Sequence, residues 1–174
     1  IVLRMSENPK ENIQKGLQLA KQSLSIRPDF ASALSLAVSL EMMTGNHEDA
    51  CKKIDKIFKN AETMFETALG AAGAHNCGDL ELAISNYEYV FNTAPHFSSW
   101  ARNLYSYALV ENGDFDKALK FFEVELQKEH AFGGFSQTMY LLSAYINKKR
   151  GNERKAKELF EIQKGVDGKG KSAK

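Results

Sequence analysis

The sequence predicts an all-α fold, an α-solenoid of antiparallel helix pairs with about nine helices. One skeleton occurs four times: a glycine, Asp or Asn, three residues, an alanine, three residues and a large apolar residue. The glycines are 33, 35 and 38 residues apart, a period typical of helical repeat arrays. The chain has only three prolines and is rich in Ala, Leu, Lys and Glu, which favours helix. The repeated glycines are Gly45, Gly78, Gly113 and Gly151.

Each position of the skeleton has a structural role. Glycine ends a helix in the left-handed conformation, and the Asp or Asn that follows can cap the next helix. The alanine lets the two helices of a pair approach closely, and the apolar residue one turn later fills the space behind it. The alanines are Ala50, Ala83, Ala118 and Ala156, and the apolar residues are Ile54, Tyr87, Phe122 and Phe160.

The elements are expected in the following order. Residues 1–8 form an irregular lead-in that ends at Asn8-Pro9, a cap and first helical position. A single domain then extends over 9–164, followed by a disordered basic tail at 165–174. The domain comprises a lone helix at 9–27 and helix pairs at 31–60, 63–94, 98–128 and 137–164. Residues 48–59 are expected to form one continuous helix, and Gly133-Gly134 a flexible loop within 129–136.

These pairs resemble tetratricopeptide repeats (TPRs) over about residues 10–164. The Gly-Asp/Asn turns and the alanines match that family's pattern, as do the small helix positions Ala37, Ala71 and Ala108 and the closing prolines Pro28 and Pro95. No closing proline follows Lys59 or Lys128. The resemblance implies a right-handed superhelix in which the first helix of each pair lines a concave groove. It also implies a non-catalytic scaffold that binds a peptide or protein segment there.

The repeat register predicts which side chains line this groove. The large aromatic groups are the strongest candidates, since Trp and Tyr supply contact area together with a polar group. Ser35 and Ser39 occupy positions where some family members hold a peptide's terminal carboxylate, so no such clamp is expected. The predicted partner-binding residues are Phe65, His75, Trp100, Asn103, Tyr107, Leu141, Tyr145 and Lys148. The full predicted lining adds Ser32, Ser35, Ser39, Met42, Ala68, Ala72, Val110 and Thr138.

The amino-acid composition bears on membrane insertion and on the redox state of the compartment. It contains no apolar run long enough for a membrane span, so membrane insertion is not expected. Cys51 and Cys77 are 26 residues apart, and we expect them to be reduced packing residues in a reducing, cytoplasmic location. The first residue is Ile1, and we expect the chain to be part of a longer protein.

No catalytic, metal or cofactor site is expected. Residues 165–172 match the phosphate-binding pattern G-x-x-x-x-G-K-S, but that chemistry requires a strand before the loop and a helix after it. Here the pattern follows a predicted helix and lies two residues from the end of the sequence. The four histidines have no ligand spacing.

Alternatives to a peptide-binding scaffold remain open. The lone helix and the junction at residues 28–31 are similar to repeat regions appended to bacterial nucleotide cyclases and winged-helix regulators, which implies a regulatory or dimerising region. Residues 148–174 hold ten Lys or Arg and four Asp or Glu, a net charge of +6, which allows nucleic-acid binding. The rest of the chain is net acidic, which argues against it. Dimerisation through the lone helix would give a homodimer. The basic residues considered for nucleic acid are Lys148, Lys149, Arg150, Arg154, Lys155 and Lys157.

Overall fold

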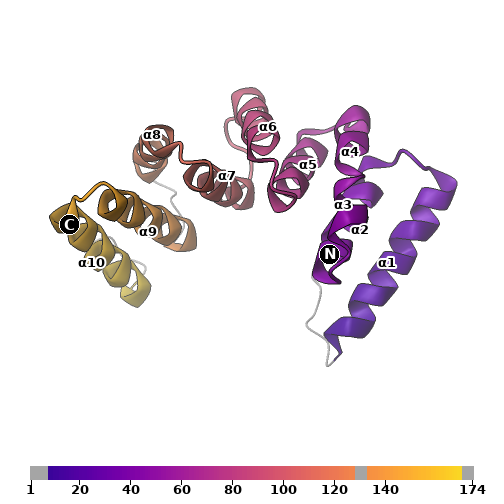
Figure 1. Cartoon of the computed structure of the whole chain (residues 1–174), viewed down its shortest axis with the longest axis horizontal. Helices are drawn as coiled ribbons and strands as arrows, with labels where there is room; N and C mark the ends of the chain where they lie inside the picture. The colour runs from indigo at the N-terminus through magenta and orange to yellow at the C-terminus, as the bar shows by residue number, and fades with distance from the viewer. Residues whose placement is uncertain (1–7, 128–132, 170–174) are drawn as a thin grey trace. The chain divides into compact units, whose positions relative to one another are not determined.

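The computed structural model describes residues 8–127 and 133–169, which form ten α-helices and no strand (Figure 1). The all-α prediction is confirmed. One helix more than expected is present because the second helix of the first pair is divided into α3 and α4. The helices are α1 (Pro9–Ile26), α2 (Ala31–Met43), α3 (His47–Cys51), α4 (Ile54–Asn60), α5 (Met64–Asn76), α6 (Leu80–Thr93), α7 (Ser99–Glu111), α8 (Phe115–Leu126), α9 (Gly133–Lys149) and α10 (Glu153–Lys169).

The four glycine turns share one backbone geometry. Each glycine has a φ angle between 77° and 82°, in the left-handed region, as predicted. The residue after each glycine donates its amide to the carbonyl oxygen five residues earlier. For example, Asp114 N lies 2.9 Å from Leu109 O and Asp79 N lies 3.0 Å from Ala74 O. This is the Schellman arrangement, which satisfies carbonyls at a helix end.

The predicted side-chain caps are present only in part. Asp79 accepts a hydrogen bond from Leu82 N at 3.1 Å and caps α6. Asn46 and Asp114 make no such bond to their helices, so the prediction is wrong at these two turns. Asp114 instead accepts from the side chain of Asn112 at 3.0 Å. The feature that all four turns share is therefore the backbone hydrogen bond and not a side-chain cap.

The repeated alanine is buried in every pair, as the skeleton predicts. The apolar residue one turn later is also buried in the first three pairs, at Ile54, Tyr87 and Phe122. Phe160, in the last pair, is 42% exposed because α10 is the last described helix. The skeleton therefore encodes packing within and between pairs, and in its last copy the Phe160 ring stays partly exposed, with the Lys164 ammonium 4.7 Å from its centroid.

The chain divides between Phe97 and Ser98 into two compact units, whereas the sequence predicted a single domain. In the first unit, α2 packs against α1, α3, α4 and α5, and α5 packs against α6. Small residues allow the close approach of α5: a methyl group at Gly73 would lie 2.5 Å from Ile54 Cδ1. The core of this unit includes Leu34, Val38, Ile54, Ile57, Ala71, Tyr87 and Val90.

In the second unit, α7 packs against α8 and α9, and α9 packs against α10. Its core includes Ala101, Leu109, Phe122, Met139 and Ile146. The ring of Tyr105 on α7 meets that of Phe121 on α8 edge to face, with centroids 4.9 Å apart. The second unit thus consists of two consecutive helix pairs, α7 with α8 and α9 with α10.

Several predicted boundaries are wrong. Gly133 and Gly134 begin α9, so the predicted loop is wrong over 133–136, and residues 128–132 lie outside the described part. The predicted disordered tail is helical to Lys169, with 170–174 outside the described residues. The first five residues of the phosphate-loop pattern therefore belong to a helix. The lead-in at 1–7 also lies outside the described residues.

The prediction of reduced cysteines is wrong. Cys51 and Cys77 form a disulfide, with their Cα atoms 5.7 Å apart. Disulfides persist in oxidising compartments, so the bond removes the reason for expecting a reducing one. The cytoplasmic location stays a prediction, and the disulfide argues against it. No helix within 8–127 or 133–169 has the length and apolar character needed to cross a bilayer.

Candidate functional site

Six of the eight predicted binding residues lie on the first helices of the two pairs in the second unit. Trp100, Asn103 and Tyr107 are spaced three and four residues apart on α7, so they share one side of that helix. Leu141, Tyr145 and Lys148 have the same kind of spacing on α9. Because α7 packs against α9, we treat the six residues as one surface, the α7–α9 face.

Large apolar side chains are exposed on the α7–α9 face. Tyr107 is 39% exposed, Leu141 44% and Tyr145 45%. Tyr107 and Tyr145 each stand six residues before a turn glycine, so they occupy equivalent positions in successive repeats. Equivalent positions on neighbouring helices of an array point to the same side. The face therefore presents two phenol groups and an aliphatic side chain from adjacent helices.

Trp100 and Asn103 are only partly exposed. The Asn103 Oδ1 atom is buried and has no hydrogen-bond partner among the described residues. A buried acceptor of this kind costs free energy unless a partner or a water molecule reaches it. The predicted contact between Asn103 and a bound backbone would therefore have to use the amide Nδ2 as a donor.

The C-terminal end of α9 carries positive charge. Lys148 and Lys149 are exposed, and neither forms an ion pair with any residue in the described ranges. The Lys149 ammonium lies 5.6 Å from the centroid of the Tyr145 ring, within cation–π range. This end of the face can therefore attract a carboxylate.

The other basic groups considered for nucleic acid are largely paired within the chain. Arg150 bonds Asp116 at 2.8 Å and lies over the ring of Phe115. Arg154 and Lys155 both approach Glu158, at 3.7 and 3.5 Å. Their charge is partly neutralised locally, which weakens the nucleic-acid alternative.

A buried ion pair fixes the inner side of α7. Arg102 Nη1 lies 2.5 Å from Glu125 Oε1 on α8, and the two side chains are only 8% and 6% exposed. Ser106 donates to the Arg102 carbonyl at 2.8 Å, one turn along the helix. The rotation of α7 about its axis is thereby fixed, which sets the direction of Tyr107 on its outer side. Nothing in the repeat skeleton signals this pair.

The remaining two predicted residues belong to the first unit. Phe65 is 51% exposed at the start of α5, and His75 is half-buried near its end, about 15 Å away along the helix axis. The eight predicted residues therefore form two sets, one in each unit.

Sequence reasoning missed part of the exposed surface of α2. Leu36 is 46% exposed and Met43 69% exposed. Ser35, predicted to line the groove, is instead buried and donates its hydroxyl to the Ala31 carbonyl at 2.9 Å. Ala68 on α5 is likewise buried. Of the four residues predicted to line α2, Ser39 is exposed and Ser32 and Met42 are partly exposed, so the prediction is wrong at Ser35 alone.

Glu66 positions the start of α5 beside Phe65. The Thr63 hydroxyl, at the N-cap, accepts from Glu66 N at 3.2 Å, and the Glu66 carboxylate accepts from Glu62 N, one residue before the cap, at 2.9 Å, an arrangement similar to a capping box. Ser32 Oγ on α2 also donates to this carboxylate, at 2.6 Å. Burial alone would raise the pKa of Glu66, but the hydrogen bonds from Ser32, Glu62 and Thr63 outweigh it, so the pKa is lowered.

Two hollows in the described part of the first unit lie away from the predicted residues. One of about 300 Å³ lies at the junction of α4, α5 and α6, and includes Phe58, Glu62 and Tyr89. Another is a shallow depression along α1. Among the described residues, no three His, Cys, Asp or Glu side chains gather in a way that could hold a metal ion.

No protein-family model matches the sequence, and no curated protein matches it either. Solved structures do match. YrrB, described as a TPR protein with an unusual peptide-binding site, has a TM-score of 0.68 at 16% identity, covering 90% of this chain and 78% of that one. MamA from Desulfovibrio magneticus RS-1 has a TM-score of 0.70 at 16% identity, covering 89% and 85%.

A putative kinesin light chain of Podospora anserina, with nearly identical TPR-like repeats, has a TM-score of 0.71 at 14% identity, covering 90% of this chain and 87% of that one. At these identities the likeness shows the fold alone. The resemblance to tetratricopeptide repeats is therefore confirmed at the level of the fold: this chain has the TPR fold.

Proposed function

We propose that this chain is a non-catalytic scaffold that binds an extended peptide or protein segment on the α7–α9 face. The observation that carries the proposal is the exposure of Tyr107, Leu141 and Tyr145 on two packed first helices. Rigid aromatic side chains supply contact area at a low cost in conformational entropy and dominate many interfaces. The peptide-binding site named for YrrB, which has the same fold, is consistent with this use.

The face favours a segment with apolar side chains followed by an acidic residue. The apolar groups would pack against Tyr107, Leu141 and Tyr145. The acidic residue would lie near Lys148 and Lys149, whose charges are unpaired among the described residues. The Nδ2 group of Asn103 would donate to a carbonyl of the bound backbone.

A displayed library of random 12-residue peptides, selected against the immobilised chain, provides a probe of defined sequence. The selected peptide's Kd is then measured by calorimetry for the wild type and for the double variant Trp100→Ala with Tyr107→Ala. We expect the double variant to weaken binding at least about tenfold, because exposed aromatic anchors carry a large share of interface energy.

Tyr89→Ala is the matched control, since Tyr89 is 54% exposed on α6, a second helix of the other unit. Its Kd should equal that of the wild type. An unchanged Kd in the double variant, with circular dichroism showing an intact fold, would remove the α7–α9 face as the site. A loss of affinity on changing Phe65 instead would place binding on the first unit.

A further inference from the structure

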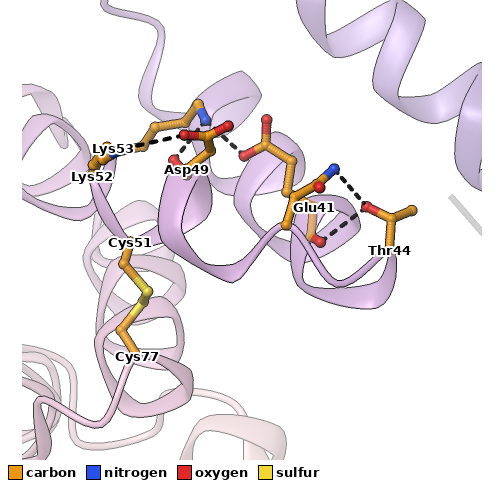
Figure 2. Close-up of polar contacts among 8 residues, drawn as sticks. Glu41, Thr44, Asp49, Cys51, Lys52, Lys53 and Cys77 are labelled. Atoms are coloured by element: carbon orange, nitrogen blue, oxygen red, sulfur yellow. Dashed lines mark hydrogen bonds and ion pairs between the residues drawn. A yellow bond between two sulfur atoms is a disulfide. The ribbon is translucent and has the colours of Figure 1, made fainter.

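The disulfide joins the two pairs of the first unit at an irregular position. Cys51 is the last residue of α3, and Cys77 directly follows α5 (Figure 2). They are the two cysteines of the chain, and both are partly exposed. A small dithiol can therefore reach the bond.

The helix that carries Cys51 is interrupted directly after it. The second helices of the other pairs, α6, α8 and α10, are continuous over 14, 12 and 17 residues. In the first pair, Lys52 and Lys53 form a tight turn between α3 and α4: both keep right-handed helical backbone angles, but Lys53 N bonds the Ala50 carbonyl only three residues back. The break and the disulfide therefore coincide.

Local sequence does not explain the interruption. Sharp helix breaks usually occur at proline or at glycine and serine, and residues 50–55 contain none of these. Lysine, which occupies both turn positions, is a good helix former. The cause must then be tertiary, and the covalent bond to Cys77 is the constraint that acts at this point.

A side-chain hydrogen bond replaces a backbone hydrogen bond that is lost where the helix is interrupted. The Asp49 carbonyl, which Lys53 N would meet in a continuous helix, instead accepts from Lys53 Nζ at 2.7 Å. The same ammonium pairs with Glu41 Oε2 on α2, also at 2.7 Å, with both side chains largely buried (Figure 2). A carbonyl left free by the break is thus satisfied by a side chain.

We propose that the Cys51–Cys77 disulfide is a redox-sensitive lock that holds the second helix of the first pair in two pieces. Reduction lets α3 and α4 join into one helix. A dithiol supplies the electrons: its thiolate attacks one sulfur and the Cys51–Cys77 bond breaks, giving a mixed disulfide and one cysteine thiolate. The second thiol of the reductant then displaces the other cysteine. The reductant leaves as a disulfide, and the two cysteines take up two protons.

Reduction of the disulfide would loosen the connection between α3 and the end of α5 in the first unit. The bond ties α3 to the end of α5 next to His75, so its loss leaves only non-covalent packing between these two helices. The α7–α9 face lies in the other unit, which contains neither cysteine.

Amide hydrogen exchange and backbone chemical shifts, recorded by NMR on the whole chain with and without dithiothreitol, test the lock. In the reduced protein we expect amide exchange at Lys53 and Ile54 to slow by about tenfold or more, and the Lys53 amide shift to change as its acceptor passes from the Ala50 carbonyl to the Asp49 carbonyl. The variant Cys51→Ser with Cys77→Ser should show the same values without reductant, and dithiothreitol should then change nothing.

Three results would overturn the proposal. The first is a break at Lys52–Lys53 that persists in both the reduced protein and the serine variant. The second is loss of the helical circular dichroism of the first unit on reduction, which would make the bond a structural staple only. The third is two titratable thiols in protein oxidised with a disulfide such as oxidised dithiothreitol, which would mean that the bond does not form.

Discussion

Replacing Arg102 by methionine should strongly destabilise the second unit. The guanidinium lies 2.5 Å from the Glu125 carboxylate, and both side chains are more than nine-tenths buried. The variant leaves the Glu125 carboxylate in the core without that guanidinium. Breaking a buried pair in this way costs about 3–5 kcal/mol, because the remaining charge has lost its solvation.

The double variant Arg102→Met with Glu125→Met distinguishes the net contribution of the ion pair to stability from the free-energy cost of leaving one charge buried. Buried pairs replaced by apolar side chains of similar volume are often neutral or up to about 4 kcal/mol more stable. We therefore expect the double variant to regain most or all of the stability lost by Arg102→Met. Arg154→Met is the control, because its pair with Glu158 lies in the same unit but is exposed, so the loss of stability should be far smaller.

Urea denaturation followed by fluorescence is a suitable assay. Trp100 is the single tryptophan and lies on α7, so its emission reports on the unit that contains the ion pair. An Arg102→Met variant as stable as the wild type, or a double variant no better than Arg102→Met, would refute the reasoning. Either result would mean that water reaches the pair or that α7 adjusts at little cost.

Two further predictions concern the first unit. Gly73→Ala should be less stable than the matched variant Gly165→Ala by about 1–3 kcal/mol. The reason is that a methyl group at Gly73 would lie 2.5 Å from Ile54 Cδ1, whereas one at Gly165 meets nothing within 4 Å. Equal shifts of the urea midpoint in the two variants would contradict this prediction. For Glu66, the lowered pKa means that its ionised form stabilises the fold above the unfolded-state pKa and that this contribution is lost as pH falls through the folded pKa. The stability advantage of the wild type over Glu66→Gln should therefore shrink below about pH 4.5, and a constant difference between pH 7 and pH 3 would exclude the shift.

Local chemistry made most of the fold predictable. The glycines, alanines and apolar residues of the skeleton sit where turn geometry and close packing require them, as the positive φ of Gly113 and the burial of Ala118 and Phe122 illustrate. Such signals act within a few residues of one another, so they do not depend on the tertiary structure. The lone helix at Asn8-Pro9 was predictable for the same reason.

Features that depend on contacts between distant residues were not predictable. The break after Cys51 and the disulfide to Cys77 connect segments 26 residues apart, and the residues at the break show no helix-breaking pattern. Arg102 and Glu125 resemble ordinary surface charges until α7 and α8 are packed. On α2 the prediction failed at Ser35, because successive helical side chains point about 100° apart and the exposed residue there is its neighbour Leu36.

In the proposed function, the first helices of the pairs, and not the repeated turns, carry the binding surface. The most direct measurement is photo-cross-linking of the selected 12-residue peptide, carrying a benzophenone group at its apolar position, followed by mass spectrometry of the modified chain. We predict cross-links to Tyr107, Leu141 or Tyr145 on the α7–α9 face. Cross-links confined to Val124 on α8 or to Phe160 on α10, both also exposed apolar residues, would contradict the account.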